Sequence, residues 1–157
     1  MRQTITICLV VITLLLTTVS KSASGQNKLP QTTTTAVNSA SDQLIGPKWK
    51  LFELHGQAVV RNAQSKEDSY IRFTKEGTIS AYTGCNNMTG SYQVHKGFGI
   101  KFTNIASTRM ACPDMKTEQI LNQVLQTADN FTIKGRRLTL SKAGQKPLAV
   151  FVAEEVK

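Results

Sequence analysis

The sequence predicts an α+β fold that is mostly antiparallel β: a small, strongly curved sheet or partly open barrel of seven to eight strands with one helix. Three observations lead to this prediction. Short runs of alternating apolar and polar residues are separated by glycine-containing turns, which is the pattern of successive hairpins. One segment, residues 115–128, instead carries apolar residues at helical spacing. A sheet of this size protects its edges by curling, and a helix can cover the remaining gap.

The first 25 residues have the pattern of a secretory signal peptide. Arg2 supplies a positive start, an apolar run extends from Ile5 to Val19, and Ala23-Ser24-Gly25 is a small-residue cleavage site. A membrane anchor is the alternative, but fifteen residues that include four threonines are short for a hydrocarbon layer about 30 Å thick. A lipid anchor would need a cysteine just after the apolar run, whereas Cys8 lies inside it. We therefore expect a periplasmic or secreted chain that is soluble, with no stable membrane anchor, after signal-peptide cleavage.

Residues 26–46 are rich in Thr, Ser, Asn and Gln and show no apolar period, so we expect a disordered polar linker there. The folded domain is expected over residues 47–157. The chain has a formal net charge of +9, and its 19 basic residues less Arg2 and Lys21 leave 17 against 10 acidic residues, or +7. These basic residues are scattered and rarely lie beside aromatic ones. We therefore attribute the charge to solubility and expect no nucleic-acid partner.

The strands should place their apolar side chains in the interior of the barrel. Trp49, the only tryptophan, is expected to plug the core, and Phe73, Phe98, Phe102 and Phe131 are expected to point inward with it, either filling the interior or lining a cavity. In chain order, the predicted elements are a strand at 48–54, an ambiguous segment at 57–68 with a short strand at 58–60, hairpins at 71–81, 92–102 and 131–140, the helix at 115–128 between the last two hairpins, and an end strand in which Leu148, Val150 and Val152 alternate.

The predicted helix has a defined start. Asp114 is the expected N-cap, and Pro113 stops the preceding segment from continuing as a strand. The apolar positions that should share one face of this helix are Ile120, Leu121, Val124, Leu125 and Ala128.

Two blocks, residues 83–92 and 107–114, carry the residues most suited to a special role. Cys85 and Cys112 are the only cysteines outside the signal peptide, and in an exported chain a disulfide between them is the expected state. Two free buried thiols are one alternative. A catalytic thiol with His55 or His95 as its base is another, although the pair lacks the C-x-x-C spacing of redox enzymes.

The polar neighbours of these cysteines have two interpretations each. Asn86 and Asn87, beside Gly84, suit turn positions with positive φ or side-chain bonds to the backbone, and a binding role for their amides is the alternative. Arg109, next to Thr108, could hold an anionic ligand. We favour a structural role in which Arg109 bonds carbonyl groups or an acid such as Glu118 and fixes the entry to the helix.

Nothing in the sequence predicts catalysis. It contains no glycine-rich phosphate loop, nucleophile elbow or cluster with metal-ligand spacing, and the two histidines are 40 positions apart. We therefore assign no catalytic residue, no metal site and no cofactor.

Several short motifs, in order along residues 47–153, resemble the META domain of the HslJ-like heat-shock proteins. The resemblance implies a strongly curved antiparallel β structure with one helix. It also implies an envelope protein linked with heat shock and antibiotic tolerance, with no accepted enzymatic reaction. The absence of a lipid-attachment cysteine departs from many relatives. The motifs that carry the resemblance are Trp49-x-Leu51, Gly84-Cys85-Asn86 with Gly90-x-Tyr92, Thr108-x-Met110-x-Cys112, Glu118, and Leu138-x-Leu140.

Together these observations lead us to expect a non-catalytic exported domain, monomeric, that supports envelope stress tolerance by binding an envelope protein. The alternative is a barrel that binds a small apolar ligand or a lipid in its interior. We rank protein interaction first because small barrels are usually filled by their own side chains.

Overall fold

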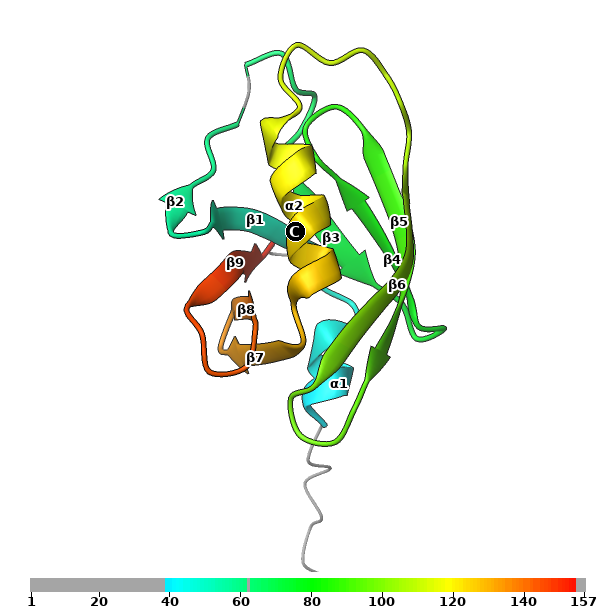
Figure 1. The fold of residues 1–157 in the computed structure, drawn as a ribbon, viewed down its shortest axis with the longest axis vertical. Coiled ribbons are helices and arrows are strands. Elements are labelled where there is room, and N and C mark those ends of the chain that lie inside the picture. The colour runs from blue at the N-terminus through cyan, green and yellow to red at the C-terminus, as the bar shows by residue number, and fades with distance from the viewer. Residues whose placement is uncertain (1–38, 62, 155–157) are drawn as a thin grey trace, which may run out of the picture. The chain divides into compact units, whose positions relative to one another are not determined.

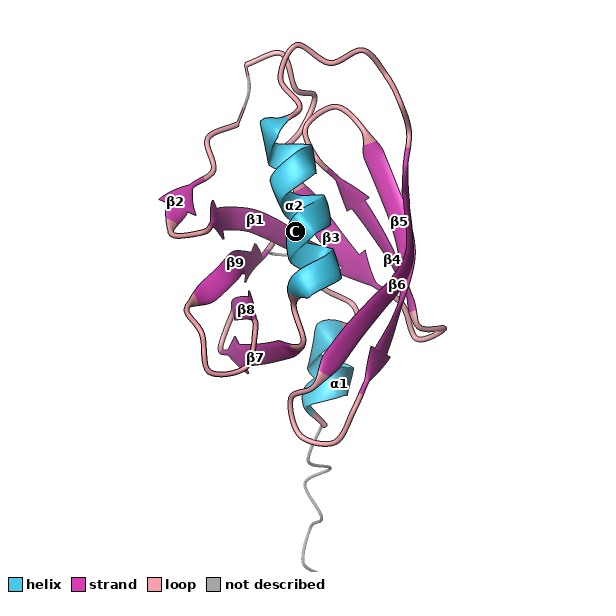
Figure 2. Ribbon diagram, in the orientation of Figure 1, coloured by secondary structure: helices cyan, strands magenta, loops and turns pink. Residues whose placement is uncertain are grey.

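The computed structural model of the chain describes residues 39–61 and 63–154 (Figures 1 and 2). The predicted signal peptide, residues 1–25, and the predicted linker up to residue 38 lie outside the described residues. The elements, in chain order, are α1 (Ala40–Leu44), β1 (Trp49–Leu54), β2 (Gln57–Ala58), β3 (Tyr70–Phe73), β4 (Thr78–Tyr82), β5 (Asn87–Val94), β6 (Ile100–Ser107), α2 (Lys116–Thr127), β7 (Asn130–Lys134), β8 (Arg137–Ser141) and β9 (Pro147–Ala153).

All nine strands belong to one antiparallel sheet. The order across the sheet is β6-β5-β4-β3-β1-β9-β8-β7, and the short strand β2 pairs with β1 beside this path. The sheet curves so strongly that its two halves face each other, with α2 beside them (Figure 1). One half contains β3 to β6, and the other contains β1, β9, β8 and β7. The predicted fold class, a strongly curved antiparallel sheet with a helix, is confirmed; the second, short helix α1 was not predicted.

The two edges of the sheet, β6 and β7, meet only at one end. Gly99 and Asn130 form an isolated bridge there, Ile100 N–H donates to the Asp129 carbonyl at 3.0 Å, and Phe131 N–H donates to the Phe98 carbonyl at 2.8 Å. Farther along, the edges diverge and α2 lies over the opening, in contact with β6 and β9. The helix therefore covers the gap that an incompletely closed barrel would leave exposed.

Helix α2 forms as its sequence predicts, with one correction at its start. Leu121, Val124 and Leu125 are buried against the sheet. The N-cap is Met115 and not Asp114. Asp114 stands one position earlier, and its Oδ1 accepts a bond of 2.8 Å from Lys116 N–H, so the carboxylate still satisfies one of the helix's free amide donors.

Side chains fill the interior of the curved sheet. Trp49 is 2% exposed and Phe131 and Phe151 are fully enclosed, so Trp49 plugs the core as predicted. Each such side chain contributes about 1.5–3 kcal/mol through burial. Phe73 and Phe102 are also buried, with the Phe73 and Phe102 ring centroids 6.3 Å apart.

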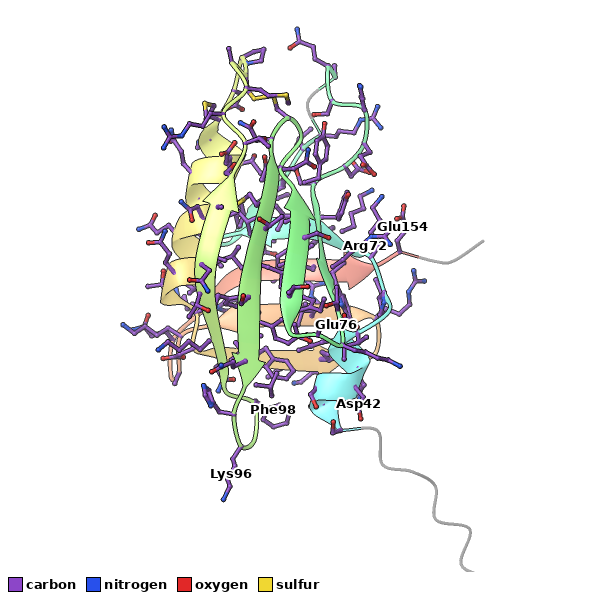
Figure 3. The ribbon with its side chains drawn as sticks, turned by 90° about the vertical axis from the view of Figure 1, so that its right-hand side faces the viewer. Asp42, Arg72, Glu76, Lys96, Phe98 and Glu154 are labelled. Atoms are coloured by element: carbon purple, nitrogen blue, oxygen red, sulfur yellow. A yellow bond between two sulfur atoms is a disulfide. The ribbon has the colours of Figure 1, made fainter. Side chains whose placement is uncertain are left out.

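Phe98 does not point inward, and that prediction is wrong. It lies in the turn of the β5–β6 hairpin and is 52% exposed (Figure 3). Strand β5 ends at Val94 and β6 begins at Ile100, so residues 95–99 form the turn of the hairpin that was predicted at 92–102. Phe98 therefore falls outside the alternation, and its ring centroid lies 6.2 Å from that of the buried Phe131 in a T-shaped arrangement.

The final strand is also shifted in phase relative to the prediction. We expected Leu148, Val150 and Val152 to alternate through this strand; Val150 is buried, but Phe151, between Val150 and Val152, is fully buried as well and belongs to the core. The register explains the shift, because Phe151 pairs with Leu51 on β1 and with Leu138 on β8, whose side chains face the core.

The folded domain begins earlier than predicted. Residues 40–44 form α1, which Ser39 starts with a capping box that involves Asp42. Leu44 is fully buried, and its carbonyl accepts a bond of 2.9 Å from Trp49 Nε1. The predicted linker is therefore wrong over residues 39–46. Five residues are too few to show a helical period, and α1 depends on tertiary contacts that its own sequence does not reveal.

Candidate functional site

The two blocks singled out in the sequence come together beside the start of α2. A disulfide joins Cys85, in the β4–β5 turn, to Cys112, in the loop that leads from β6 to α2, as predicted (Figure 3). The two Cα atoms are 6.2 Å apart and the bond closes a loop of sequence separation 27. The chain-entropy estimate for such a loop is about 3–4 kcal/mol of stabilisation.

Asn86 is fully buried at the centre of this region. Its Oδ1 accepts bonds from Thr108 Oγ1 at 2.8 Å and from Met110 N–H at 2.9 Å. Its Nδ2 donates to Glu118 Oε2 at 2.7 Å and to Cys112 Sγ at 3.3 Å. One amide therefore ties the β4–β5 turn to the β6–α2 loop, to the disulfide and to the first turn of α2.

Asn87 and Thr108 extend the same connection through the backbone. Thr108 N–H donates to the Asn87 carbonyl at 2.9 Å, and Asn87 N–H donates to Thr108 Oγ1 at 3.1 Å. Positive φ was expected at Asn86 or Asn87, but in this turn Gly84 adopts it, at 95°. The prediction of side-chain bonds to the backbone holds for Asn86, whereas the Asn87 side chain lies exposed on β5.

The predicted contact between Arg109 and Glu118 is absent. Glu118 is engaged at both oxygens, because Ser107 Oγ donates to Oε1 at 2.6 Å while Asn86 holds Oε2. Arg109 is exposed and makes no hydrogen bond or ion pair with any residue that the structure describes. Its side chain is thus left for solvent or a ligand.

An open groove of about 760 Å³ lies next to this loop. Residues 105–111 form one side of it, and Met115, Glu118 and Asn122 of the helix side form the other. We call this surface the β6–α2 groove. Met110 is 51% exposed at the groove and lines it together with Met115 and Ile105.

A bulge in β6 shapes the floor of the groove. The β5–β6 register shifts between Thr89 and Ser91, and Asn104 takes a positive φ of 54° there. The bulge lays Ile105 across Gly90, where an added Cβ would meet Ile105 Cδ1 at 2.4 Å. Any side chain at position 90 would therefore require the end of the Ile105 side chain to shift.

A second cavity, of about 330 Å³, opens on the other side of the disulfide. Phe52 and Val60, which are 49% and 86% exposed, lie at its apolar side. The charged residues around it are partly neutralised: Lys50 Nζ pairs with Asp68 at 2.5 Å, and nearby Lys48 Nζ pairs with Glu67 at 2.5 Å. The hydrogen bond to Glu67 raises the pKa of Lys48.

The described residues show no catalytic constellation. Both candidate thiols are consumed by the disulfide, and His55 and His95 lie in two different hairpin turns. Within residues 39–61 and 63–154, no three His, Cys, Asp or Glu side chains cluster as metal ligands would. In the same part of the chain, no helix has the length and apolar character to cross a bilayer.

The sequence-family model of the META domain matches residues 42–155 of the chain. These residues include both cysteine blocks and the β6–α2 groove. The chain belongs to the META domain family. The match starts within α1, in agreement with the earlier domain boundary seen in the structure. No curated protein matches the sequence of this META domain at a significant level.

Two solved structures share its fold at 23% sequence identity. One, an NMR structure of a protein, has a TM-score of 0.56 over 71% of this chain and 92% of its own. The other, an NMR structure of a protein from Burkholderia xenovorans, has a TM-score of 0.55 over 73% of this chain and 86% of its own. At this identity the likeness shows the shared fold.

Sequence reasoning missed two features of the site. It paired Glu118 with Arg109, whereas Asn86, 32 positions away, holds Glu118. It also treated Met110 only as part of a motif, although Met110 is an exposed apolar residue at the groove. Neither feature has a local signal, because both depend on how the β6–α2 loop folds back over the β4–β5 turn.

Proposed function

We propose that this META domain is a non-catalytic, exported binding module that supports envelope integrity under stress by contacting a protein partner. The observation that carries the proposal is the β6–α2 loop. A buried amide and a disulfide fix its backbone, while the side chains of Arg109 and Met110 stay exposed. A loop that is held rigid with its large side chains outward loses little entropy on binding.

The filled interior favours a protein partner over the alternative of a small apolar ligand. Trp49, Phe131 and Phe151 occupy the space in which such a ligand would lie. The two cavities described above are instead on the surface and are lined by mixed polar and apolar side chains. An apolar ligand would require the core to open, at the expense of its packing.

The state of the two cysteines supports a non-catalytic role. The disulfide joins Cys85 to Cys112, so neither can serve as the catalytic thiol considered above with His55 or His95 as its base. Export is supported by the leader pattern of residues 1–25 and by the disulfide, since such bonds persist in oxidising compartments.

The test is photo-crosslinking in cells that naturally make the protein. A photoreactive residue is placed in turn at Met110, Phe98 and Val60, which are 51%, 52% and 86% exposed. We expect a discrete protein adduct, identified by mass spectrometry, from at least one position. Native mass spectrometry of the purified protein provides the second measurement.

Two results would contradict the proposal. The first is a stoichiometric lipid or small molecule that co-purifies with the protein while all three positions give no protein adduct; this would establish the apolar-ligand alternative. The second is turnover by the purified domain that substitution of His55 or His95 abolishes, which would make the protein an enzyme.

A further inference from the structure

Arg109 is a cation at a defined place with its charge unsatisfied. The neighbouring acid, Glu118, accepts hydrogen bonds at both oxygens, from Asn86 and Ser107, and forms no ion pair with Arg109. The described part of the chain offers Arg109 no other bond. A guanidinium in this state matches the two oxygens of a carboxylate, which it can bind in a bidentate manner.

Apolar side chains lie directly beside this cation. Met110, Met115 and Ile105 line the same groove, and Met110 is half exposed. Methionine adapts its shape to different apolar partners, and both Met and Arg are enriched in the cores of protein interfaces. The groove therefore combines one charged contact with one adaptable apolar contact.

The backbone that presents these two side chains is anchored on both sides. Asn86 Oδ1 holds Met110 N–H at 2.9 Å, Thr108 is bonded to Asn86 and Asn87, and Cys112 is bonded to Cys85. Arg109 and Met110 thus sit between two fixed residues, Thr108 and Cys112, that are only four positions apart. The relative position of their Cα atoms is therefore set before any partner binds, which is the property of a preorganised recognition site.

We infer that the β6–α2 groove binds a protein segment that presents an Asp or Glu carboxylate next to a large apolar side chain. The carboxylate contacts Arg109, and the apolar side chain lies against Met110, Met115 and Ile105. The net charge, +9 for the full chain and +7 without Arg2 and Lys21 of the predicted signal peptide, favours the approach of such an acidic segment. This inference rests on the proposed function and names the chemistry of its partner.

The test uses a display library of random linear heptapeptides, selected on the protein that starts at Gln26, after the predicted signal peptide, with its disulfide intact. We expect the enriched peptides to share an acidic residue within one or two positions of Phe, Leu, Ile or Met. Synthetic copies should bind about tenfold more weakly to the Arg109→Gln variant, since one ionic contact is lost, and should also lose affinity for Met110→Ser. Arg109→Glu should reject them and select basic peptides instead.

Lys101→Gln provides the matched control. Lys101 is an exposed cation on β6, the strand that leads into the loop of Arg109, and it lies outside the residues that line the groove. Its loss changes the net charge as much as the loss of Arg109 does. Peptide affinity should be unchanged in this variant. Equal losses in both variants would show a non-specific charge effect and overturn the inference.

Three further outcomes would overturn it. These are enrichment of peptides without acidic residues, no enrichment above the starting library, and a concentration-dependent dimer that Arg109→Gln abolishes, which would make a second copy the occupant of the groove. In these cases a protein adduct from Val60 or Phe98 in the crosslinking experiment would still support the proposed function. Failure of the inference and failure of the function are therefore distinguishable.

Discussion

At the scale of single residues, Asn86 holds the site together. Asn86 has no exposed surface. Its backbone carbonyl also accepts hydrogen bonds from Thr83 N–H and Thr83 Oγ1, both at 3.0 Å. A buried polar side chain is tolerated only when its bonding groups are satisfied, and the Asn86 amide meets that condition at both ends. The residue therefore has a structural role in this domain, and the binding role that we propose belongs to the residues that it positions.

The first prediction follows from this network. Asn86→Ala should lower the free energy of unfolding by about 2–4 kcal/mol, because Met110 N–H and Thr108 Oγ1 lose their acceptor and Glu118 loses a donor. Asn87→Ala is the control: the Asn87 side chain is exposed, and the change should be within about 0.5 kcal/mol. Urea unfolding measures both. Equal effects of the two substitutions would contradict the role assigned to Asn86.

Tyr92 leads to a prediction about alkaline pH. Burial favours the neutral phenol, so the pKa of Tyr92 is raised above its ordinary value near 10. Between the pKa of the unfolded state, near 10, and the higher pKa of the folded state, Tyr92 is protonated in the folded protein and deprotonated in the unfolded chain. The resulting stabilisation is complete below about pH 10 and is lost as pH rises through the raised pKa of the folded state.

Tyr92→Phe should remove this alkaline loss. The variant should be less stable at neutral pH by roughly 0.5–1.5 kcal/mol, because the hydroxyl no longer donates to the Thr74 carbonyl at 2.9 Å. Above about pH 10 the two stability curves should converge. Unfolding in urea between about pH 8 and pH 11 tests this, since the other titrating groups are common to both proteins. Curves that stay parallel would refute it.

At the scale of elements, the sequence predicted what depends on local pattern. The hairpins around Gly77 and Gly135 form where they were expected, because these glycines adopt φ of 76° and 58° at the turns. The predictions failed where a distant contact decides. Phe98 turns outward because the bridge between Gly99 and Asn130 lengthens its hairpin turn, and α1 forms because Leu44 enters the core.

The features of the site likewise include some that local sequence predicts and some that depend on distant contacts. The Cys85–Cys112 pair could be predicted from the number of cysteines and the leader, and the positions of Asn86 and Thr108 beside it were also visible in sequence. The partner of Glu118 could not be predicted. The sequence offers Glu118 three candidate donors: Arg109, Ser107 and Asn86. The path of the β6–α2 loop determines that Ser107 and Asn86 are the ones that bond to it.

Helix α1 should be required for stability, although it lies outside the predicted domain. A chain that starts at Ser39 should be as stable as the longer one, whereas a chain that starts at Pro47 should lose about 3–5 kcal/mol, because Leu44 leaves the core and Trp49 Nε1 loses its acceptor. Leu44→Ala should lower stability by about 2–5 kcal/mol, and the exposed Gln43→Ala should be nearly neutral. Equal stability of the two truncated chains would contradict this assignment.

The disulfide should stabilise the domain without being needed for its fold. Replacement of both cysteines by serine should lower the free energy of unfolding by about 3–4 kcal/mol, since the unfolded chain regains the freedom of a loop with sequence separation 27. Asn86 still holds the β6–α2 loop in this variant, so the fluorescence of the buried Trp49 should stay native. Reduction of the unaltered protein is the control. Unchanged stability in both experiments would argue against the bridge.

At the scale of the whole molecule, compartment and stability are linked through the same bond. If residues 1–25 direct export, the Cys85–Cys112 disulfide forms in an oxidising compartment. The domain then gains the stabilisation from this bond only after it leaves the cytoplasm. The domain is small enough for that contribution to be a large fraction of its total stability. A retained chain would therefore be both reduced and less stable.

Export with cleavage near Gly25 is the prediction that tests this link. Protein from the envelope fraction should lack residues 1–25 by intact mass, carry no acyl group and resist alkylation at Cys85 and Cys112 unless reductant is added. Substitution of Leu14 and Leu15 by Arg, which interrupts the apolar run, should leave the full-length chain in the cytoplasm with both thiols open to alkylation. Since the two substitutions lie outside the folded domain, any change at the cysteines reports the compartment. Full-length, oxidised protein in the cytoplasm would contradict the prediction, because the bridge would then form without export.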